Sequence, residues 1–348
     1  MAKSFKFGDA VPTTHSALYE KQATSALLGA AVGDAFGVTF EFLPSHTVAQ
    51  YDLENMHGAD VEPDVPSYWG LRIPSGAWSD DTSMAVATME SIVENGGEIN
   101  PTSLMKYFVS WWEDGAYCSI DYPFGIGQAV AKALGKFENG IPAEECGGTR
   151  VRDNGNGALM RIFPVVLYLR DELSGEPEQK VRAYETICAA TRITHAHPIS
   201  QVSNLIYAEF LNSVLDGATI PDAYRQTVAS CSSDLGGFIE ENGWEDALHA
   251  HARILATDFL AIDRSLLEPT GYVVHTFEIV LYALLHSSSY KEAVQTAVSF
   301  GGDTDTYAAI AGAVAGVAHG AESIPAEWLE RLKRRDYLES LAFRFGGI

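Results

Sequence analysis

Two short clusters of carboxylate and hydroxyl side chains stand out in this chain of 348 residues. The first is Ser79-Asp80-Asp81-Thr82 and the second is Asp303-Thr304-Asp305-Thr306. Each stands directly before a run of small and apolar residues that favours a buried helix. A buried carboxylate without a partner is costly, and carboxylate and hydroxyl oxygens are ligands that Mg²⁺ and Mn²⁺ prefer. The two clusters therefore predict a binuclear metal site.

An ordinary alternative applies to both clusters. Asp and Ser are favoured at helix N-termini, where the positive end of the helix dipole stabilises an ionised carboxylate. The aspartates could thus cap two helices and face water. Two features favour the metal: Asp303 follows the pair Gly301-Gly302, and the adjacent charges of Asp80 and Asp81 repel one another unless a cation lies between them.

Other residues could contact a ligand. The segments 124–128 (FGIGQ) and 154–161 (NGNGALMR) place small, turn-forming residues before a helix, where backbone N–H groups can hold a diphosphate. Neither completes a GxGxxG pattern, so each can equally be an ordinary turn. Glu41 stands alone in an apolar stretch, where a structural ion pair is the alternative to catalysis. Of His195 and His197, we expect one to reach a ligand and the other to pack structurally.

The composition excludes some function classes. A formal net charge of −23 argues against binding to nucleic-acid phosphates. The four cysteines are far apart and form no CxxC pair, which is typical of reduced thiols in a cytoplasm. The first residues contain no apolar signal segment. No apolar run is expected to span a membrane, since the nearest candidate, 308–320, is short and weakly hydrophobic.

Helical periodicity dominates the chain, and alternating strand-like runs are scarce, so the fold is expected to be all-α. Residues 16–348 should form one domain, preceded by an N-terminal extension of residues 1–15 that is either a frayed tail or a docking arm for a partner protein. The candidate helices are 16–37, 82–94, 101–112, 128–137, 158–170, 180–191, 198–215, 221–230, 273–286, 290–298, 305–319 and 325–335.

Two of these helices carry glycines at every fourth position. The glycines are Gly29, Gly33 and Gly37 in the first helix, and Gly312, Gly316 and Gly320 near the end of the chain. A glycine inside a helix costs about 1 kcal/mol relative to alanine, so three in register need a reason. Spacing by four places them on one face, where two backbones can approach closely. We expect the two helices to pack against each other and to bring Glu41 near Asp303 and Asp305.

In their order along residues 22–320, these motifs resemble those of the ADP-ribosylglycohydrolase family. The matching pieces are Gly29-Ala30-Ala31-Val32-Gly33-Asp34-Ala35-Phe36-Gly37, Glu41, Trp78-Ser79-Asp80-Asp81-Thr82, Gly155-Asn156-Gly157-Ala158-Leu159-Met160-Arg161, Thr194-His195, and Gly301 to Thr306. Ser79 stands where the family usually has Thr, which keeps the hydroxyl. Phe36 stands where Leu is usual, a change of packing only.

The resemblance implies a compact orthogonal helical bundle with two Mg²⁺ or Mn²⁺ ions in a cleft. The implied metal ligands are Ser79, Asp80, Asp81, Asp303, Asp305 and Thr306. The implied catalytic residues are Glu41, Asp80 and Asp303, and the implied substrate-binding residues are Gly127, Asn156, Gly157 and His195. Two divalent ions would also offset the clustered aspartates and make room for a diphosphate.

The implied function is a hydrolase that removes ADP-ribose from a modified protein side chain, with arginine as the expected acceptor. Serine-linked ADP-ribose or a small ADP-ribose ester is the alternative within the same chemistry, which passes through an oxocarbenium-like transition state. A second class of function is an immunity protein that binds an ADP-ribosyltransferase toxin through residues 1–15, with or without hydrolysis. A catalytically dead relative is disfavoured because every acidic ligand position is filled.

Overall fold

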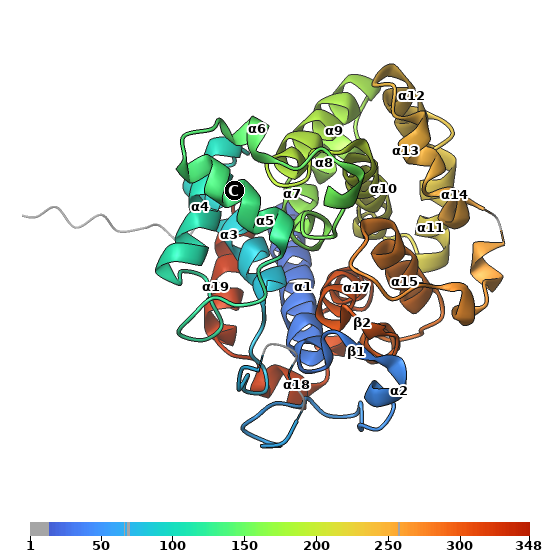
Figure 1. Cartoon of the computed structure of the whole chain (residues 1–348). Coiled ribbons are helices and arrows are strands. Elements are labelled where there is room, and N and C mark those ends of the chain that lie inside the picture. Colours follow the sequence, from blue (N-terminus) through green and yellow to red (C-terminus); the bar gives the residue numbers. More distant parts are fainter. Residues whose placement is uncertain (1–13, 66, 68–69, 257) are drawn as a thin grey trace, which may run out of the picture.

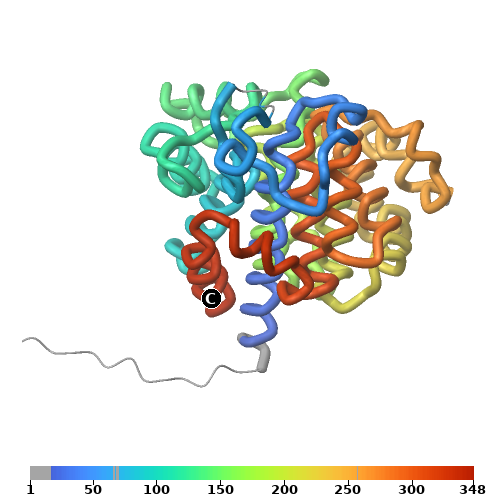
Figure 2. Tube along the Cα trace, turned by 90° about the horizontal axis from the view of Figure 1, so that it is seen from below, coloured from blue at the N-terminus to red at the C-terminus, as the bar shows by residue number. Residues whose placement is uncertain are grey.

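Two helices, α1 (Thr14–Gly37) and α17 (Thr304–His319), lie side by side at the centre of the molecule (Figure 1). The computed structural model describes residues 14–348, apart from 66, 68–69 and 257. The docking arm expected in residues 1–15 therefore lies almost wholly outside the described residues. Figure 2 shows the same pair from below, with the other helices arranged around it.

The expected glycine contact between the two helices is confirmed. A Cβ atom at Gly29 would overlap the carbonyl oxygen of Gly312, and one at Gly33 would overlap that of Ala308. The remaining member of the second stripe, Gly320, was wrongly assigned to this face. It follows the last residue of α17 with a φ of 82°, where a residue without a Cβ ends a helix readily.

The other elements surround this pair. Across the described residues the longer helices are α3 (Asp80–Glu94), α4 (Pro101–Asp114), α5 (Gln128–Glu138), α9 (Pro177–Arg192), α10 (Pro198–Leu215), α11 (Ile220–Ser230), α12 (Asp234–Glu241), α15 (Val273–Leu285), α16 (Tyr290–Val298) and α19 (Arg335–Gly346). The shorter ones are α2 (Ser45–Val48), α6 (Ala143–Cys146), α7 (Phe163–Tyr168), α8 (Arg170–Leu173), α13 (Glu245–His249), α14 (Ala252–Leu255) and α18 (Ala326–Arg331).

Short 3₁₀ turns and one strand pair complete the fold. The turns are η1 (Val38–Phe40), η2 (Val151–Asp153), η3 (Leu159–Arg161), η4 (Phe259–Ala261), η5 (Arg264–Leu266) and η6 (Ala321–Ser323). The strands β1 (Leu43–Pro44) and β2 (Gly301–Gly302) pair antiparallel, with Leu43 opposite Gly302.

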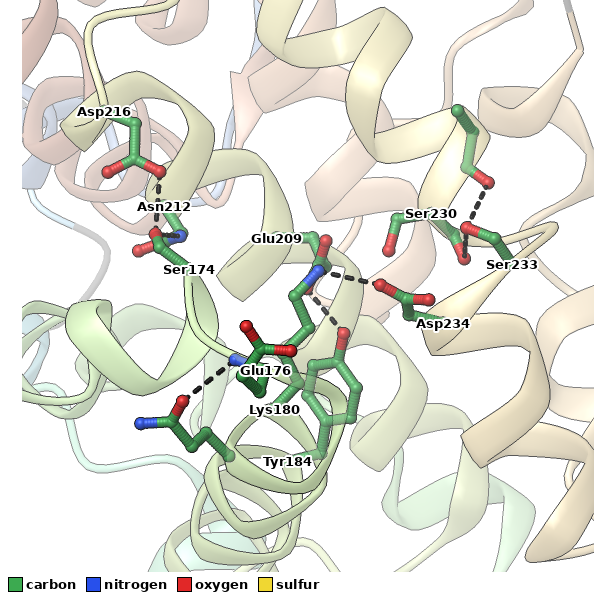
Figure 3. A network of polar contacts seen from close by, with 12 residues as sticks. Ser174, Glu176, Lys180, Tyr184, Glu209, Asn212, Asp216, Ser230, Ser233 and Asp234 are labelled. Carbon is green, nitrogen blue, oxygen red and sulfur yellow. Dashed lines mark hydrogen bonds and ion pairs between the residues drawn. The ribbon is translucent and has the colours of Figure 1, made fainter.

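Polar contacts fasten the outer helices on both sides. The C-terminal helix α19 packs on α1 and α3, where Arg344 donates to the buried Glu90 at 2.6 Å. On the other side, Figure 3 shows a network that joins α9, α10 and α12. In it, Lys180 of α9 pairs with Asp234 of α12 at 2.8 Å, and the Tyr184 hydroxyl donates to Glu209 of α10 at 2.7 Å.

Two expected helices, 158–170 and 325–335, are broken in the structure. The first divides into η3, α7 and α8. Pro164 has no N–H to donate and is tolerated only in the first turn of α7, which accounts for the break between η3 and α7. The second ends at Arg331, since Arg334 adopts a left-handed conformation with φ of 52° and a separate helix, α19, begins at Arg335. The expected 198–215 and 290–298 are confirmed to the residue.

No apolar segment was expected to be long enough to span a membrane, and this expectation is wrong for one segment. Residues Ala17–Phe40 are long and apolar enough to cross a membrane by length and composition alone. In the fold, 94% of the apolar window is buried among other helices. Its composition is that of a central core helix.

We predict that Gly33→Ala lowers the free energy of unfolding by about 3 kcal/mol or more, because the added methyl group overlaps the backbone of Ala308 and Ala309. The matched control is Gly135→Ala in α5, where a Cβ meets no atom within 4 Å. That change should raise the free energy of unfolding by about 0.5–1 kcal/mol. Urea titrations compare the two variants. A Gly33→Ala protein as stable as wild type would contradict the close helix contact.

Candidate metal centre and substrate cavity

The strand pair β1–β2 holds Glu41 beside the second acidic cluster. Phe42 donates its N–H to the carbonyl oxygen of Gly302 at 2.6 Å. Both glycines of β2 have positive φ, and a Cβ at Gly301 would overlap the backbone of Leu43 and Ser45. Any other residue there would push the strands apart. The pair Gly301-Gly302 is therefore what lets the Glu41 loop approach α17.

Asp34 of α1 anchors the first acidic cluster. This fully buried carboxylate accepts hydrogen bonds from the N–H groups of Ser79 and Thr82, at 2.9 and 3.0 Å, and from both of their hydroxyls. It thus caps the N-terminus of α3 from another helix, in place of a local capping side chain. In the sequence Asp34 is visible only as part of a family motif, and no role was predicted for it. Its signal was a single charge within an apolar, glycine-striped helix.

The carboxylates meet in two groups that share Asp305. One oxygen each from Asp34, Asp81 and Asp305 lie within 4.8 Å of one another, and so do single oxygens from Glu41, Asp303 and Asp305. All five residues are buried. The helix contact thus brings the two halves of the expected site together, with Glu41 beside Asp303 and Asp305 as predicted.

Two hydroxyls and a further carboxylate border these groups. Ser79 Oγ lies 2.9 Å from Asp34 Oδ1 and 3.0 Å from Asp81 Oδ2. The Thr306 side chain, in the first turn of α17, lowers the pKa values of Asp81 and Asp303, partly opposing burial. Asp80 lies at the cavity beside Gly125, where a Cβ would overlap its Oδ1.

The buried carboxylates hold their protons more tightly than exposed ones. Burial raises the pKa of Asp34 to about 6, against hydrogen bonds from Thr82 and Ser79 that lower it. Burial, with the charges of Asp34 and Asp303, raises the pKa of Asp80 to about 8. Burial raises the pKa of Asp303, and burial with neighbouring carboxylates raises the pKa values of Asp81 and Asp305. The cluster is therefore strained electrostatically without a cation.

The donor set fits a hard divalent cation. Asp81 Oδ1 is buried and accepts no hydrogen bond from the described residues, so the protein leaves a carboxylate oxygen for another partner. The two groups consist of carboxylates, and neither Cys nor His joins them among the described residues. Such oxygens suit Mg²⁺ or Mn²⁺ rather than softer metals.

A cavity of about 420 Å³ opens beside the carboxylates, within the range of small-molecule sites. Its lining includes Glu41, Phe42, Asp80, Asp81, Gly125, Gly127, Arg152, Asn156, Gly157, His195, Asp303 and Thr306. All four expected substrate-binding residues are among them. Of the expected metal ligands, Asp80, Asp81, Asp303 and Thr306 reach the cavity, while Ser79 and Asp305 lie behind them.

The loop Asn154–Gly157 forms one wall of the cavity and holds Asp303. The Asn156 amide donates to Asp303 Oδ2 at 2.7 Å and to Thr276 Oγ1 at 3.0 Å. The Asn156 N–H donates to the carbonyl oxygen of Gly271 at 3.1 Å, which ties the loop to the start of α15. Thr276 carried no sequence signal, since it is an isolated hydroxyl in an apolar helix.

A second loop supports Asp80. Gly127 precedes α5, and its backbone hydrogen bond to Asp80 lowers the pKa of that carboxyl, partly opposing burial. The expected cradle at 124–128 thus contacts a carboxylate as well as the cavity.

Of the two histidines, one lines the cavity and the other has a structural position, as expected. His195 is buried in the cavity wall, whereas His197 caps α10 by accepting from the N–H of Ile199 at 3.2 Å. Burial and the nearby Arg161 lower the pKa of His195 to about 3, so its imidazole is neutral. Asp153 also lines the cavity and forms an ion pair with Arg150 at 2.8 Å.

The acidic cluster should make the metal-free protein less stable as pH rises. Because the folded-state pKa values of Asp34 and Asp80 are raised above the unfolded value near 4, the two carboxyls contribute fully to the free energy of unfolding below about pH 4. This contribution is lost as the pH rises through about 6 for Asp34 and about 8 for Asp80. The buried neutral imidazoles of His195 and His251 act in the opposite sense. The contribution of the cluster is therefore best measured as the difference in free energy of unfolding between wild type and a variant that lacks one of its carboxylates.

We predict that the free energy of unfolding of chelator-treated wild type, minus that of Asp80→Asn, falls by more than about 1 kcal/mol between pH 5 and 8.5. Adding Mg²⁺ at pH 8 should stabilise wild type more than Asp80→Asn. Exposed Asp121→Asn, which also removes one negative charge, should track wild type. A difference that stays constant with pH would contradict the strained cluster.

Comparison with known proteins gives one consistent answer. The model of the ADP-ribosylglycohydrolase family matches residues 15–347. The ADP-ribosylarginine hydrolase Tri1 of Serratia proteamaculans (strain 568) is 27% identical over 325 residues, covering 92% of this chain and 78% of the relative. The ADP-ribosyl-[dinitrogen reductase] glycohydrolase of Rhodospirillum rubrum is 26% identical over 315 residues, covering 89% of this chain and 90% of the relative.

A solved structure, described as an ADP-ribosylglycohydrolase-related protein complex, superposes with a TM-score of 0.71 at 27% identity. The match covers 95% of this chain and all of that one. These findings confirm the resemblance and the all-α fold. The chain belongs to the ADP-ribosylglycohydrolase family of enzymes.

Proposed function

We propose that this protein is a metal-dependent hydrolase that removes ADP-ribose from ADP-ribosylated protein side chains, with arginine as the acceptor. The observation that carries the proposal is the meeting of two carboxylate groups with the Asn156–His195 wall around one cavity. The names of the relatives, an ADP-ribosylarginine hydrolase and an ADP-ribosyl-[dinitrogen reductase] glycohydrolase, support the substrate class.

The residues that would hold two Mg²⁺ or Mn²⁺ ions are the six implied ligands, with Asp34 and Glu41 at either edge. The six implied ligands are Ser79, Asp80, Asp81, Asp303, Asp305 and Thr306. When bound, such ions supply Lewis acidity, contacts to ribose hydroxyls and a water of lowered pKa. The protein's part is to keep these oxygens fixed: Asn156 orients Asp303, and the hydrogen bonds that Asp34 accepts from Ser79 and Thr82 fix the first turn of α3.

Three side chains are proposed to act on the substrate. Asp80 and Asp303 line the cavity and are the carboxylates proposed for proton transfer to and from the reacting groups. Glu41 stands at the end of a 3₁₀ turn, held by the strand pair, and is proposed to orient the modified side chain or to gate its entry. Phe42 beside it has a φ of 58°, a costly conformation for a residue with a side chain, which the strand pair maintains.

Charge supports arginine as the acceptor. Bound divalent ions would offset the carboxylates that hold them, but the whole chain still carries a formal charge of −23. A guanidinium approaching this opening is attracted, whereas a neutral serine hydroxyl gains nothing from the field. Among the described lining residues, Arg152 is the one Lys or Arg side chain, and its exposed guanidinium can meet the diphosphate of ADP-ribose.

Other expectations stay predictions. Toxin docking through residues 1–15 concerns a segment that lies almost wholly outside the described residues. Deletion of these residues would separate the roles, since lost toxin protection with intact hydrolysis would support docking. A cytoplasmic location and the absence of nucleic-acid binding likewise rest on composition alone.

We predict Mg²⁺- or Mn²⁺-dependent release of ADP-ribose from an arginine-linked ADP-ribosyl peptide, measured by chromatography. Asp81→Asn should lower the rate at least about 100-fold, because it removes charge from the metal-binding oxygens. Exposed Asp121→Asn should retain the rate within about twofold. A serine-linked peptide tests the alternative acceptor. Release from neither peptide, or full activity of Asp81→Asn in chelator-treated buffer, would overturn the proposal.

A further inference from the structure

Arg161 is a fully buried cation with an unusual set of partners. Its Nη2 donates to the carbonyl oxygen of Ala190 at 3.2 Å and to Thr194 Oγ1 at 2.8 Å. Its guanidinium carbon lies 4.7 Å from the centre of the Phe108 ring. No carboxylate within the described residues forms an ion pair with it, and its Nε and Nη1 have no hydrogen-bond partner there. Its charge therefore lies uncompensated beneath the cavity wall.

Thr194 joins this cation to His195. The hydroxyl oxygen of Thr194 lies 2.9 Å from His195 Nδ1, and Thr194 itself is fully buried. A guanidinium has five N–H donors and no acceptor, so Thr194 must accept from Arg161. The single proton of the hydroxyl then needs an acceptor elsewhere. Among the described residues, Nδ1 of His195 is the one acceptor in reach.

This fixes where the imidazole carries its proton. A neutral imidazole has one N–H and one bare nitrogen. If Nδ1 carried the proton, two donors would face Thr194 Oγ1 and the hydroxyl proton would be buried without an acceptor, which is costly. With Nδ1 accepting from Thr194, the proton resides on Nε2. The Thr194 hydroxyl and His195 Nδ1 are then both satisfied along one line, Arg161 to Thr194 to His195.

Nε2 faces the cavity. A Cβ at Gly155 would lie 3.6 Å from this nitrogen, and one at Gly157 would lie 3.7 Å from it, so the missing side chains of these cavity-lining glycines leave room beside it. No described protein group hydrogen-bonds to Nε2. The backbone of His195 is held in place, since Gln201 donates to its carbonyl oxygen at 2.7 Å and its N–H donates to that of Thr191 at 3.0 Å.

We propose that Arg161 and Thr194 are positioning residues that set His195 as a fixed Nε2–H donor toward an oxygen of the bound ligand, in a diphosphate or its adjoining ribose. The identity of that ligand rests on the proposed function; the position of the proton does not. An acceptor oxygen with negative charge also gains from the uncompensated guanidinium behind the imidazole. In this arrangement a neutral histidine recognises an anion without having to be protonated.

The first test reads the proton directly. Protein labelled with ¹⁵N-histidine is studied by long-range ¹H–¹⁵N correlation NMR at pH 7.5, and the His195 signals are assigned by their loss in His195→Asn. Wild type and Thr194→Ser should show the Nε2–H tautomer, because both retain the hydroxyl. Thr194→Val should show a new Nδ1–H population. An Nδ1–H tautomer in wild type, or no change in a folded Thr194→Val, would overturn the proposal.

The second test reads the consequence for binding. Calorimetry with ADP-ribose should show about tenfold weaker binding by Thr194→Val, with Thr194→Ser within about threefold of wild type. In hydrolysis, KM should rise by a similar factor with kcat little changed, as expected for a contact made equally in the ground and transition states. A fall in kcat with KM unchanged would contradict this role.

The two proposals fail separately. If no ADP-ribosyl peptide is hydrolysed, the proposed reaction is wrong, yet the wild-type NMR spectrum still decides where His195 carries its proton. If hydrolysis proceeds and His195 carries the proton on Nδ1, the reaction stands and the hydrogen-bond line through Thr194 falls. Should Thr194→Val not fold, the spectra of wild type and Thr194→Ser alone distinguish the two tautomers.

Discussion

The close approach of α1 and α17 is the constraint on which the rest of the structure depends. Without side chains at Gly29, Gly33 and Gly312, the two backbones meet directly. Asp34 on one helix and Asp305 on the other then reach the same small volume, although aspartate is a short side chain. Longer residues at the contact would separate the helices and divide the carboxylates between them. The site is placed by main-chain contact, which is stiffer than contact through flexible side chains.

This arrangement concentrates negative charge where burial disfavours it. Within the described residues, hydrogen bonds rather than protein cations stabilise the cluster: four N–H and O–H groups of Ser79 and Thr82 donate to Asp34, and the Asn156 amide donates to Asp303. Arginine side chains that are buried or partly buried interact with other groups. Arg161 lies behind His195, and Arg344 holds Glu90. Electrostatic strain therefore remains at the site, as is common where a protein is built to receive a ligand.

Much of the helix contact and of the acidic site could be predicted from the sequence because both depend on local patterns of residues. The glycine spacing predicted the helix contact, and the Ser/Asp/Thr clusters predicted the two halves of the acidic site. What escaped depends on distant partners. Asp34 caps a helix that begins 46 positions later, at Asp80, and no local capping motif records such a bond. Similarly, the proton of His195 is decided by Arg161, whose role is invisible until the fold brings α9 and η3 together. The breaks at Pro164 and Arg334 were local, and Pro164 could have been anticipated.

The strand pair β1–β2 has a consequence for how the protein is made. Its two strands lie near opposite ends of the chain, and the bond from Thr304 to Gly37 spans 267 positions. During synthesis, the first helix leaves the ribosome long before its glycine-faced partner exists. Its apolar, small-residue surface must wait for most of the polypeptide, so high contact order and slow, late closure follow. A nascent chain that ends before Gly301 has all the residues of one acidic cluster and nothing to close it.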